Sequence, residues 1–482
     1  MTQCNQDALL FQELSSRQVV ARFDGGQVTS DAGGLLLREV ESKFHFIERF
    51  ADCFTDHRDP ELVEHTLPEL LKQRIFGLCL GYEDLNDHER LRYDPLLAIL
   101  VGKKDPVGAE RIRDRDRGKA LAGKSTLNRL ELTPVRAHAG SRYKKIVAHL
   151  EAIQAFLVEA FLGQYLLPPQ RIILDVDATD DPLHGQQLGR FFHGYYHSYC
   201  YLPLYIFCGD HPLLALLRPS DIDTSTGLLK HLIRIVNRIR QQWPNVQIVV
   251  RGDSGFCREH LMCWCEANGV DYLFGLAKNA RLLRILGKEL HQAQEQFAQT
   301  QQPSRVFKDF SYRTRKSWSR ERRVVGKAEH LAQGANPRFV VTSLSAAEFP
   351  AQTLYEQDYC GRGDMENRIK EQQLMLFADR TSCATMRANQ IRLALSTVAY
   401  VVLRALRAYG LPQTELAQAQ CDTIRLKLLK IGAVIRVTVR RVSVSLSESY
   451  PFREVFVRVY QNLRRLIAPP VIVPAAMPAP SG

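Results

Sequence analysis

The sequence predicts an α/β core flanked by helical and basic regions, and three observations lead to this prediction. Between residues 166 and 277, short apolar runs typical of strands alternate with stretches of helical periodicity. The same strand-like composition returns near residue 338, after a basic and polar stretch that interrupts the alternation. Residues before 165 carry mainly helical apolar spacing. Because alternating strands and helices are typical of layered α/β folds, the core is expected in the middle of the chain.

The elements of this core are expected in the order β-β-β-α-β-α-β. The strands are short apolar runs at residues 171–176, 199–207, 212–217, 246–250 and 272–276. Gly209 and Asp210 separate the second strand from the third and predict a hairpin. Helical spacing is found at residues 228–243 and 258–268. After the interruption we expect a strand at residues 339–342, a strongly periodic helix at 355–377 and an apolar helix at 391–406.

These patterns divide the chain into six segments. Helices are expected before the core at residues 62–78 and 146–162. A Pro- and Ala-rich tail, expected to be disordered, follows the last basic region. The segments are residues 1–165 (mainly helical), 166–277 (first part of the core), 278–337 (basic insertion), 338–410 (second part of the core), 411–467 (basic C-terminal region) and 468–482 (tail).

The composition favours a polyanionic partner. The 482 residues include 64 Lys and Arg against 52 Asp and Glu, a net charge of +12. This balance favours nucleic acid or an anionic membrane surface, and a basic protein without such a partner is the alternative. The longest apolar run, residues 393–403, is far shorter than the ~20 residues that a membrane span needs, so no membrane partner is expected. The 11 cysteines and the polar residues 1–12 predict a cytoplasmic protein with reduced thiols.

Carboxylates follow two of the expected strands directly. Asp175 and Asp177 end the first strand and point to one face of it, because side chains alternate along a strand. Buried carboxylates are costly unless they are paired or bind a metal, and two oxygens on one face suit a hard divalent cation. Asp253, between Gly252 and Gly255, follows the strand at residues 246–250 and lies where α/β sheets place their ligands. Taken alone, each segment is also compatible with an ordinary solvated strand end.

A third carboxylate lies on the expected helix at residues 355–377. A polar stripe, with spacings of three or four residues, consists of Tyr359, Arg362, Glu366, Lys370 and Gln373. An apolar stripe about 80° round the helix consists of Met365, Ile369 and Leu376. One face can therefore pack on the sheet while the polar face lines a cleft. The alternative is a surface helix with ion pairs.

Together the three segments predict a two-metal site. One acid from each strand and Glu366 from the helix can converge on two divalent ions. Such ions, ~3.5–4 Å apart, activate the attacking oxygen and stabilise the leaving oxygen in phosphoryl transfer. Neighbouring Arg and Lys side chains would bind the phosphates.

Two other motifs lack the context that their binding sites need. Residues 118–125 match the P-loop pattern, but the preceding residues 111–117 are charged and do not form a buried strand. A DNA-contacting element, in which Lys124 and Arg129 bind phosphates, explains this stretch better than an NTP-driven enzyme. A group of possible zinc ligands has poor spacing for a structural site and consists of Cys257, His260, Cys263 and Cys265.

The motifs together resemble those of DDE insertion-sequence transposases. The resemblance is specifically to the 1380 group, which is related to a larger set with a Tyr-x2-Arg-x3-Glu-x6-Lys signature, and it spans nearly the whole chain. The matching motifs, in the expected order, are Phe23-Asp24-Gly25-Gly26, residues 29–34, 81–88, 177–182, 184–187, 194–196, 199–205, 251–256, and Ser317-Trp318 with Arg322-Arg323.

The resemblance implies an RNase H-like mixed-sheet catalytic core with a β-rich insertion. It implies that Asp177, Asp253 and Glu366 bind two Mg²⁺ ions, with Mn²⁺ as a substitute. Asp177 is preferred to Asp175 because the family's first acid precedes a small residue and a Thr or Ser. The signature's last Lys is Gln373 here.

The neighbouring residues acquire roles from the same resemblance. Tyr359 and Arg362 would hold phosphates of the transposon end, and Lys370 is the candidate to replace the missing Lys. In related enzymes the insertion stacks a flipped base on Trp, for which Trp318 is the candidate. Arg322 and Arg323 lie beside Trp318 in the sequence, and a core tryptophan in a small β domain is the alternative.

The implied function is DNA transposition in a bacterial cytoplasm, in association with the nucleoid. Residues 1–165 would bind DNA, and the partners would be the terminal inverted repeats and the target DNA. A homodimer is expected in the DNA complex because two ends must meet. The alternative is a catalytically inactive DNA-binding protein on a transposase fold, which Gln373 favours.

Overall fold

The computed structural model describes residues 8–467, which divide into two units. The central unit comprises residues 148–397, and the terminal unit comprises residues 8–147 together with 398–467. The chain therefore leaves the terminal unit, builds the central unit and returns. The predicted tail, residues 468–482, lies outside the described residues. Among the residues described, no helix is long and apolar enough to cross a membrane.

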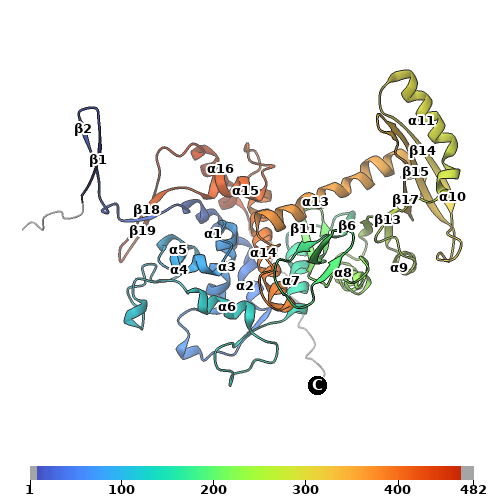
Figure 1. Cartoon of the computed structure of the whole chain (residues 1–482). Helices are drawn as coiled ribbons and strands as arrows, with labels where there is room; N and C mark the ends of the chain where they lie inside the picture. The colour runs from blue at the N-terminus through green and yellow to red at the C-terminus, as the bar shows by residue number, and fades with distance from the viewer. Residues whose placement is uncertain (1–7, 468–482) are drawn as a thin grey trace, which may run out of the picture. The chain divides into compact units, whose positions relative to one another are not determined.

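A mixed sheet of nine strands organises the central unit (Figure 1). β6 pairs antiparallel with β10 and parallel with β12, and β12 pairs parallel with β13. The order is β11-β10-β6-β12-β13-β17-β15-β14, with β16 paired to β15. The strands are β6 (Arg171–Ala178), β10 (Leu204–Cys208), β11 (His211–Leu216), β12 (Gln247–Gly252), β13 (Asp271–Leu276), β14 (Ser304–Tyr312), β15 (Arg322–Leu331), β16 (Gly334–Ala335) and β17 (Arg338–Thr342). The predicted α/β fold is confirmed as a mixed α/β structure.

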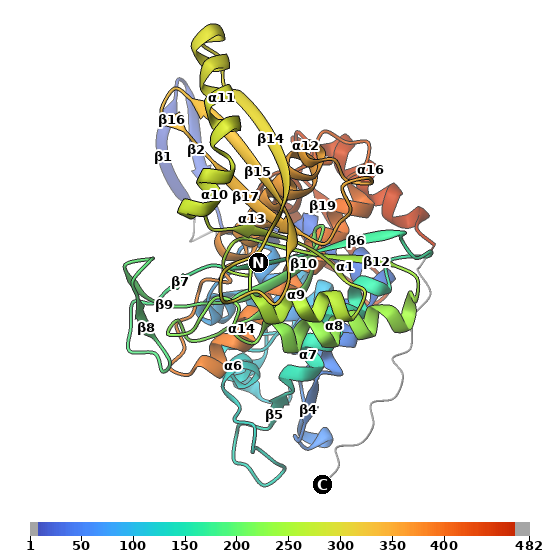
Figure 2. The same cartoon turned by 90° about the vertical axis from the view of Figure 1, so that its right-hand side faces the viewer.

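The two faces of this sheet are covered differently. One face packs on α7 (Leu150–Leu162), α8 (Leu228–Gln242) and α9 (Glu259–Ala267), which lie below the strands in Figure 2. Leu174, Val176 and Val250 point to this side. Val249 and Leu273 point to the other side and pack on the chain that follows β17. Since side chains alternate, Asp175, Asp177 and Arg251 also point to that second side.

The second face is covered by a continuous but irregular helical segment. It runs through α12 (Ala351–Thr353), η5 (Leu354–Tyr359), η6 (Cys360–Arg362), α13 (Gly363–Lys370) and η7 (Glu371–Met375). Both η5 and η7 are π-turns. Each π-turn widens the helix locally, so a helical wheel of 3.6 residues per turn does not predict which side chains share a face. α14 (Met386–Ala405) follows and confirms the expected apolar helix at residues 391–406, which begins five residues earlier than predicted.

A small second sheet is formed by the chain between β6, which carries Asp177, and β10. It consists of β7 (Asp181–Pro182), β8 (Phe191–His193) and β9 (Ser198–Tyr201), in the order β7-β9-β8. The expected strand at residues 199–207 is thus two strands, β9 and β10. Pro203 lies between them and has no backbone N–H to continue the ladder.

The segment predicted as a basic insertion continues the main sheet. It carries α10 (Ala280–Ile285) and α11 (Gly287–Thr300), then β14 and β15, which pair with each other over nine residues. β15 also pairs with β17, which pairs with β13. Residues 278–337 are therefore β-rich at their C-terminal end and joined to the core by hydrogen-bonded strands rather than by a linker.

The terminal unit is mainly helical between β3 and β5. The expected helix at residues 62–78 is α3 (Leu67–Cys79), which begins later because Thr66 and Glu69 form a capping box. Its other helices and 3₁₀ or π-turns are η1 (Ala32–Gly34), α1 (Leu35–Phe44), α2 (Phe46–Ala51), η2 (Pro60–Leu62), η3 (Leu85–Asp87), α4 (His88–Leu91), α5 (Pro95–Val101), η4 (Asp114–Asp116), α6 (Lys124–Leu132), η8 (Leu406–Gly410), α15 (Cys421–Ile424), η9 (Arg425–Leu429) and α16 (Arg453–Arg465).

Strands tie the two halves of the terminal unit together. β18 pairs with both β19 and β3, so the C-terminal segment completes a sheet begun near the N-terminus. β1 and β2 form an exposed hairpin, and β4 pairs with β5. These strands are β1 (Leu9–Leu14), β2 (Arg17–Ala21), β3 (Gln27–Thr29), β4 (Phe54–Asp56), β5 (Ile146–Ala148), β18 (Ala433–Val437) and β19 (Val442–Leu446).

Candidate active site

Adjacent parallel strands bring the first two candidate acids to one edge of the sheet. Asp177 is the last residue but one of β6, and Asp253 follows β12 directly. Val176 and Gly252 are register partners, so the two acids follow paired positions. A Cβ on Gly252 would lie 2.7 Å from the Val176 side chain, which explains why glycine precedes Asp253. Asp253 Oδ1 accepts a hydrogen bond from the backbone N–H of Gly255 at 2.8 Å, which fixes the turn.

The third acid reaches Asp177 through a shared arginine. Arg362 Nη2 lies 2.8 Å from Glu366 Oε1, and Arg362 Nη1 lies 3.7 Å from Asp177 Oδ2. One guanidinium thus bridges an acid of the sheet and an acid of the helix. The Glu366 side chain is 45% exposed and the Asp177 side chain 15%, so the pair lies where the covered face meets solvent.

The pKa of Asp177 depends on the charges of the other two acids and of Arg362. The pKa of Asp177 is raised to about 7, chiefly by burial and also by the charges of Asp253 and Glu366, while Arg362 lowers it. The same three acids raise the pKa of Arg362 against the effect of its burial. A single guanidinium therefore leaves the cluster short of positive charge.

This donor set fits hard divalent cations. Carboxylate oxygens are the ligands that such ions prefer, and the uncompensated negative charge calls for a further cation. Within residues 8–467, no group of three His, Cys, Asp or Glu side chains is already gathered at metal-binding separation. Arg362 stands between Asp177 and Glu366, so a cation would bind by displacing its guanidinium.

Asp175 is engaged in a different interaction. Its carboxylate receives two hydrogen bonds from Arg251, at 2.5 Å from Nε and 2.7 Å from Nη2. The two residues are register partners on β6 and β12, and they are 3% and 6% exposed. Burial raises the pKa of Asp175 more than Arg251 lowers it. Asp175 thus has a close bidentate partner, whereas the contact of Asp177 with Arg362 is longer, at 3.7 Å.

Arg251 also holds the helical segment to the sheet. Its Nη1 donates to the backbone carbonyl of Asp358 in η5, and Arg171 binds the Asp358 carboxylate at 3.0 Å. A Cβ on Gly361 would lie 2.9 Å from Arg251 Nη1. Arg251 is not among the predicted site residues, although its place inside an apolar strand, two residues before Asp253, could have indicated it.

Two other residues of the predicted polar stripe, Tyr359 and Gln373, lie beside the ends of the strands that carry the acids. Tyr359 packs against the turn after β12, because a Cβ on Gly275 would lie 2.6 Å from its hydroxyl oxygen and 2.9 Å from the backbone N of Ser254. Lys370 is exposed. Gln373 donates from Nε2 to the carbonyl of Asp180 at 3.1 Å, so the position of the missing Lys lies beside the chain that follows β6.

Trp318 lies in the core, which corrects its expected role in base stacking. Its side chain is 5% exposed, and its ring contacts Tyr312 edge to face at 5.7 Å between centroids. Arg322 lies over the ring at 5.5 Å. A base has no free face of Trp318 on which to stack, so the alternative of a core tryptophan applies.

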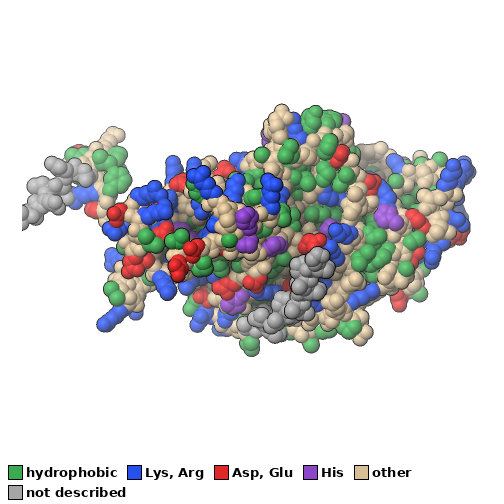
Figure 3. Space-filling view, turned by 90° about the horizontal axis from the view of Figure 1, so that it is seen from below, with side chains coloured by type: hydrophobic (Ala, Val, Ile, Leu, Met, Phe, Trp, Pro, Cys, Tyr) green, Lys and Arg blue, Asp and Glu red, His purple; other side chains and the backbone are tan. Residues whose placement is uncertain are grey.

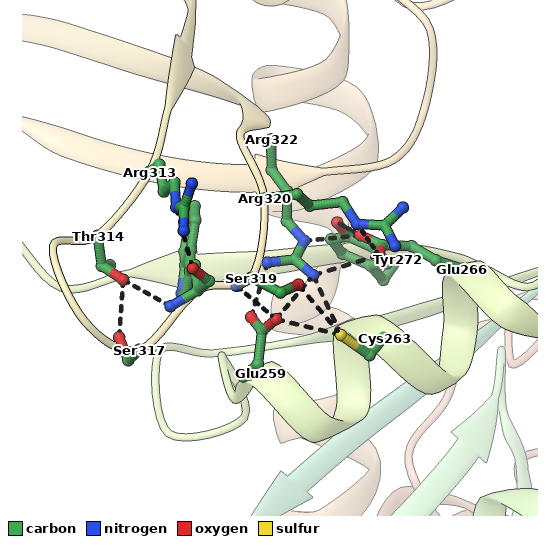
Figure 4. A network of polar contacts seen from close by, with 11 residues as sticks. Glu259, Cys263, Glu266, Tyr272, Arg313, Thr314, Ser317, Ser319, Arg320 and Arg322 are labelled. Carbon is green, nitrogen blue, oxygen red and sulfur yellow. Dashed lines mark hydrogen bonds and ion pairs between the residues drawn. The ribbon is translucent and has the colours of Figure 1, made fainter.

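Arg322 is also buried, in ion pairs with two glutamates, and is therefore not accessible to a phosphate (Figure 4). It donates to Glu259 Oε2 at 2.7 Å and to Glu266 Oε1 at 2.6 Å, and its side chain is 2% exposed. Burial raises the pKa of Glu259, but the hydrogen bonds from Arg322, Ser319 and Cys263 together outweigh burial and lower it to about 2. Cys263 joins this network through a hydrogen bond to Glu259. Arg323 instead binds Asp309 and the carbonyls of Leu344 and Phe349.

The two basic candidates of the terminal unit lie on α6. Lys124 Nζ donates to Asn86 Oδ1 at 3.0 Å, and a loop rather than a strand precedes the helix, unlike in a P-loop. Arg129 is half-buried, and burial lowers its pKa. On the face shown in Figure 3, Lys and Arg side chains are scattered, with Asp and Glu between them. Lys124 and Arg129 belong to the terminal unit, whereas the three acids belong to the central unit.

Comparisons with known proteins give one family. The family model described as "Transposase DDE domain group 1" matches residues 11–468. A search of curated proteins found no match. Among solved structures, the chain is similar to a piggyBac transposase in a synaptic complex with hairpin DNA, with 12% identity, a TM-score of 0.38, and coverage of 83% of this chain and 80% of that one.

Proposed function

This chain belongs to the family of transposase DDE domain group 1, and from that premise we propose that it is the DNA transposase of an insertion sequence. Membership makes the chain a DNA-cleaving and DNA-joining enzyme. The proposed reaction is hydrolysis of a phosphodiester at each element end, followed by attack of the released 3′-hydroxyl on target DNA. The 1380 group within this family remains the more specific proposal.

The observation that carries the proposal is that Asp177 and Asp253 follow paired positions of adjacent strands while Arg362 bridges Asp177 and Glu366. The acids come from two adjacent parallel strands and from the helical segment over the same face. Three antiparallel strands, β11-β10-β6, followed by the parallel strands β12 and β13, support an RNase H-like core. Acids at the carboxyl ends of parallel strands are where such sheets bind ligands.

Asp177, Asp253 and Glu366 would hold two Mg²⁺ ions, with Mn²⁺ as a substitute. These ions, when bound, supply the activation of the attacking oxygen and the stabilisation of the leaving oxygen. Arg362 neutralises Asp177 and Glu366 in this structure. Once the acids bind cations, its guanidinium becomes available to a phosphate, for which its fork of donors is suited.

Tyr359 and Lys370 extend the proposed phosphate-binding surface. Tyr359 lies against the Asp253 turn, and Lys370 is exposed one helical turn beyond Glu366. The DNA partners would be terminal inverted repeats and target DNA, with contacts from Lys124 and Arg129 in the terminal unit. Since two ends must meet, a homodimer is proposed for the DNA complex.

An inactive DNA-binding protein on this fold is the second candidate. The feature that favours it is Gln373, which stands where the signature has Lys and bonds the carbonyl of Asp180. Such a protein would bind element ends without cutting them.

One assay separates the two candidates. A supercoiled plasmid carrying the DNA that flanks the coding sequence is incubated with the chain and Mg²⁺, without ATP. We expect nicking by the wild type, none by Asp253→Asn or Glu366→Gln, and nicking by Asp364→Asn, an exposed acid on the same helix as Glu366. Binding by all four proteins without nicking would support the inactive candidate. Equal nicking by all four would overturn the assignment of the acids.

A further inference from the structure

A hairpin beside the acids presents an unusual set of exposed rings. We define the aromatic hairpin as residues 188–200, which comprise β8, the following turn and β9 as far as Cys200. Phe192 is 56% exposed, Tyr195 81% and Tyr199 48%. Large aromatic side chains are seldom exposed together without a partner to cover them.

The rings are held on a rigid support. Phe192 and Tyr199 are register partners, and their rings meet at 5.6 Å edge to face. Tyr201 donates its hydroxyl to the carbonyl of Leu188 at 2.7 Å, and Ser220 donates to the carbonyl of Phe191 at 3.0 Å. The hairpin is therefore anchored on both strands, so binding would not have to order it first.

The hairpin starts and ends beside Asp177. The chain leaves β6 at Ala178, forms the hairpin and returns in β10, where Leu204 pairs with Ala178 and Tyr205 with Asp177. Tyr196, in the turn, has its pKa raised to about 12 by burial and by the charges of Asp180, Asp177 and Asp253. Both observations place the hairpin within reach of a DNA strand at the acids.

The chemistry of the hairpin suits nucleic acid. Residues 183–200 contain no Asp or Glu, although Asp180 and Asp181 come just before them. Arg190 lies over the Tyr199 ring at 4.7 Å, which combines a ring with a positive charge. Aromatic rings next to cations are how proteins hold single-stranded DNA, because every base has a face that can stack.

We propose that the aromatic hairpin binds unpaired bases of the DNA strand next to the cleaved bond. Phe192, Tyr195 and Tyr199 would stack on bases, and Arg190 would bind the backbone phosphates. The inference rests on the proposed function for the identity of the DNA. Unlike the buried Trp318, the rings of the aromatic hairpin are accessible, and the hairpin lies between strands that pair at Asp177.

The test measures binding and not cleavage. The affinity of the full chain for a fluorescein-labelled dT20 strand and for a blunt 40-base-pair duplex is measured by fluorescence anisotropy, with Phe192→Ser/Tyr195→Ser against wild type. Leu166→Ser/Leu167→Ser is the matched control, because these side chains are 78% and 79% exposed and precede the opposite end of β6. Equal thermal midpoints for the three proteins show that all are folded.

We expect the hairpin variant to bind dT20 about five- to tenfold more weakly for each base that loses its stacking partner. The duplex affinity should change less than twofold, and the control should match wild type. Ultraviolet crosslinking of a 5-iodouracil-substituted strand should label a peptide from residues 188–200. Unchanged dT20 affinity in the hairpin variant would overturn the proposal.

A second outcome would also overturn it. If the variant changes the sedimentation coefficient of the DNA-free chain and leaves dT20 affinity unchanged, the rings contact a protein surface. Failure of the proposed function is distinguishable, because a chain that never nicks DNA can still lose dT20 binding in the hairpin variant. Conversely, a chain that nicks normally and binds dT20 equally well without Phe192 and Tyr195 retains its function and lacks this site.

Discussion

The buried pair of Arg251 and Asp175 offers a quantitative test of how the site is held. Arg251 donates twice to Asp175 and once to the Asp358 carbonyl, and Asp175 and Arg251 are 3% and 6% exposed. Arg251→Met removes the only cation facing the Asp175 carboxylate at hydrogen-bond distance among the described residues. The variant therefore leaves a buried charge without a partner, next to the turn that carries Asp253.

The magnitude follows from this burial. Removing one partner of a buried ion pair costs about 3–5 kcal/mol, because the remaining charge keeps its desolvation penalty. The loss of the bond to the Asp358 carbonyl adds about 1 kcal/mol. Asp175→Asn/Arg251→Met removes both charges, so its loss should be smaller than the sum of the single losses by about 2 kcal/mol or more.

Urea unfolding followed by tryptophan fluorescence measures these differences in the central unit alone. The three tryptophans, Trp243, Trp264 and Trp318, all lie within residues 148–397. A loss of less than about 1 kcal/mol in Arg251→Met would refute the reasoning. Strict additivity of the two single variants would do the same. Arg251→Lys should recover only part of the stability, since lysine cannot make the bidentate bond.

Three further predictions follow from other residues. Trp318→Ala should cost about 3–5 kcal/mol in the same urea assay and change DNA affinity less than twofold, because the ring is buried; a selective loss of DNA binding would contradict this. His88, whose pKa burial lowers to about 3, stays neutral in the folded state while the unfolded imidazole takes up a proton below about 6.5. The stability of the terminal unit should therefore fall as pH drops from 6.5 toward 3, and hydrogen exchange of α3 and α4 at pH 7 and pH 5 checks it, with a flatter dependence expected in His88→Gln. Gln373→Lys should strengthen duplex binding and steepen its salt dependence by about one charge, as measured by titrations at two salt concentrations; an unchanged slope would exclude a phosphate contact at this position.

The strand acids could be predicted from the sequence because their evidence is local. Apolar runs that end in Asp177 and Asp253 define both the strands and the ends at which the acids lie. Parallel pairing of such strands then brings the acids together. The break at Pro203 was missed because the apolar composition continues across it, although a proline inside a run argues against one continuous strand.

The helix and the tryptophan required information that is not local. The π-turns η5 and η7 insert extra residues into the turns around Glu366, so the predicted stripe holds only in part. Trp318 is covered because Arg322 reaches Glu259 and Glu266 on α9, residues far away in the sequence. Tyr195 and Tyr199 belong to matching motifs, but the exposure of the rings of the aromatic hairpin depends on the three-dimensional packing of β7 to β9.

The order of the segments along the chain affects what an incomplete polypeptide can do. During translation β6, the aromatic hairpin and β12 emerge before β14, β15 and β17, and α13 with Glu366 emerges only after those strands. A nascent or prematurely terminated chain ending before Gly363 would carry Asp177 and Asp253 without the third acid. We expect such a fragment to keep the aromatic hairpin as a DNA-binding surface while it lacks the third acid that cleavage requires.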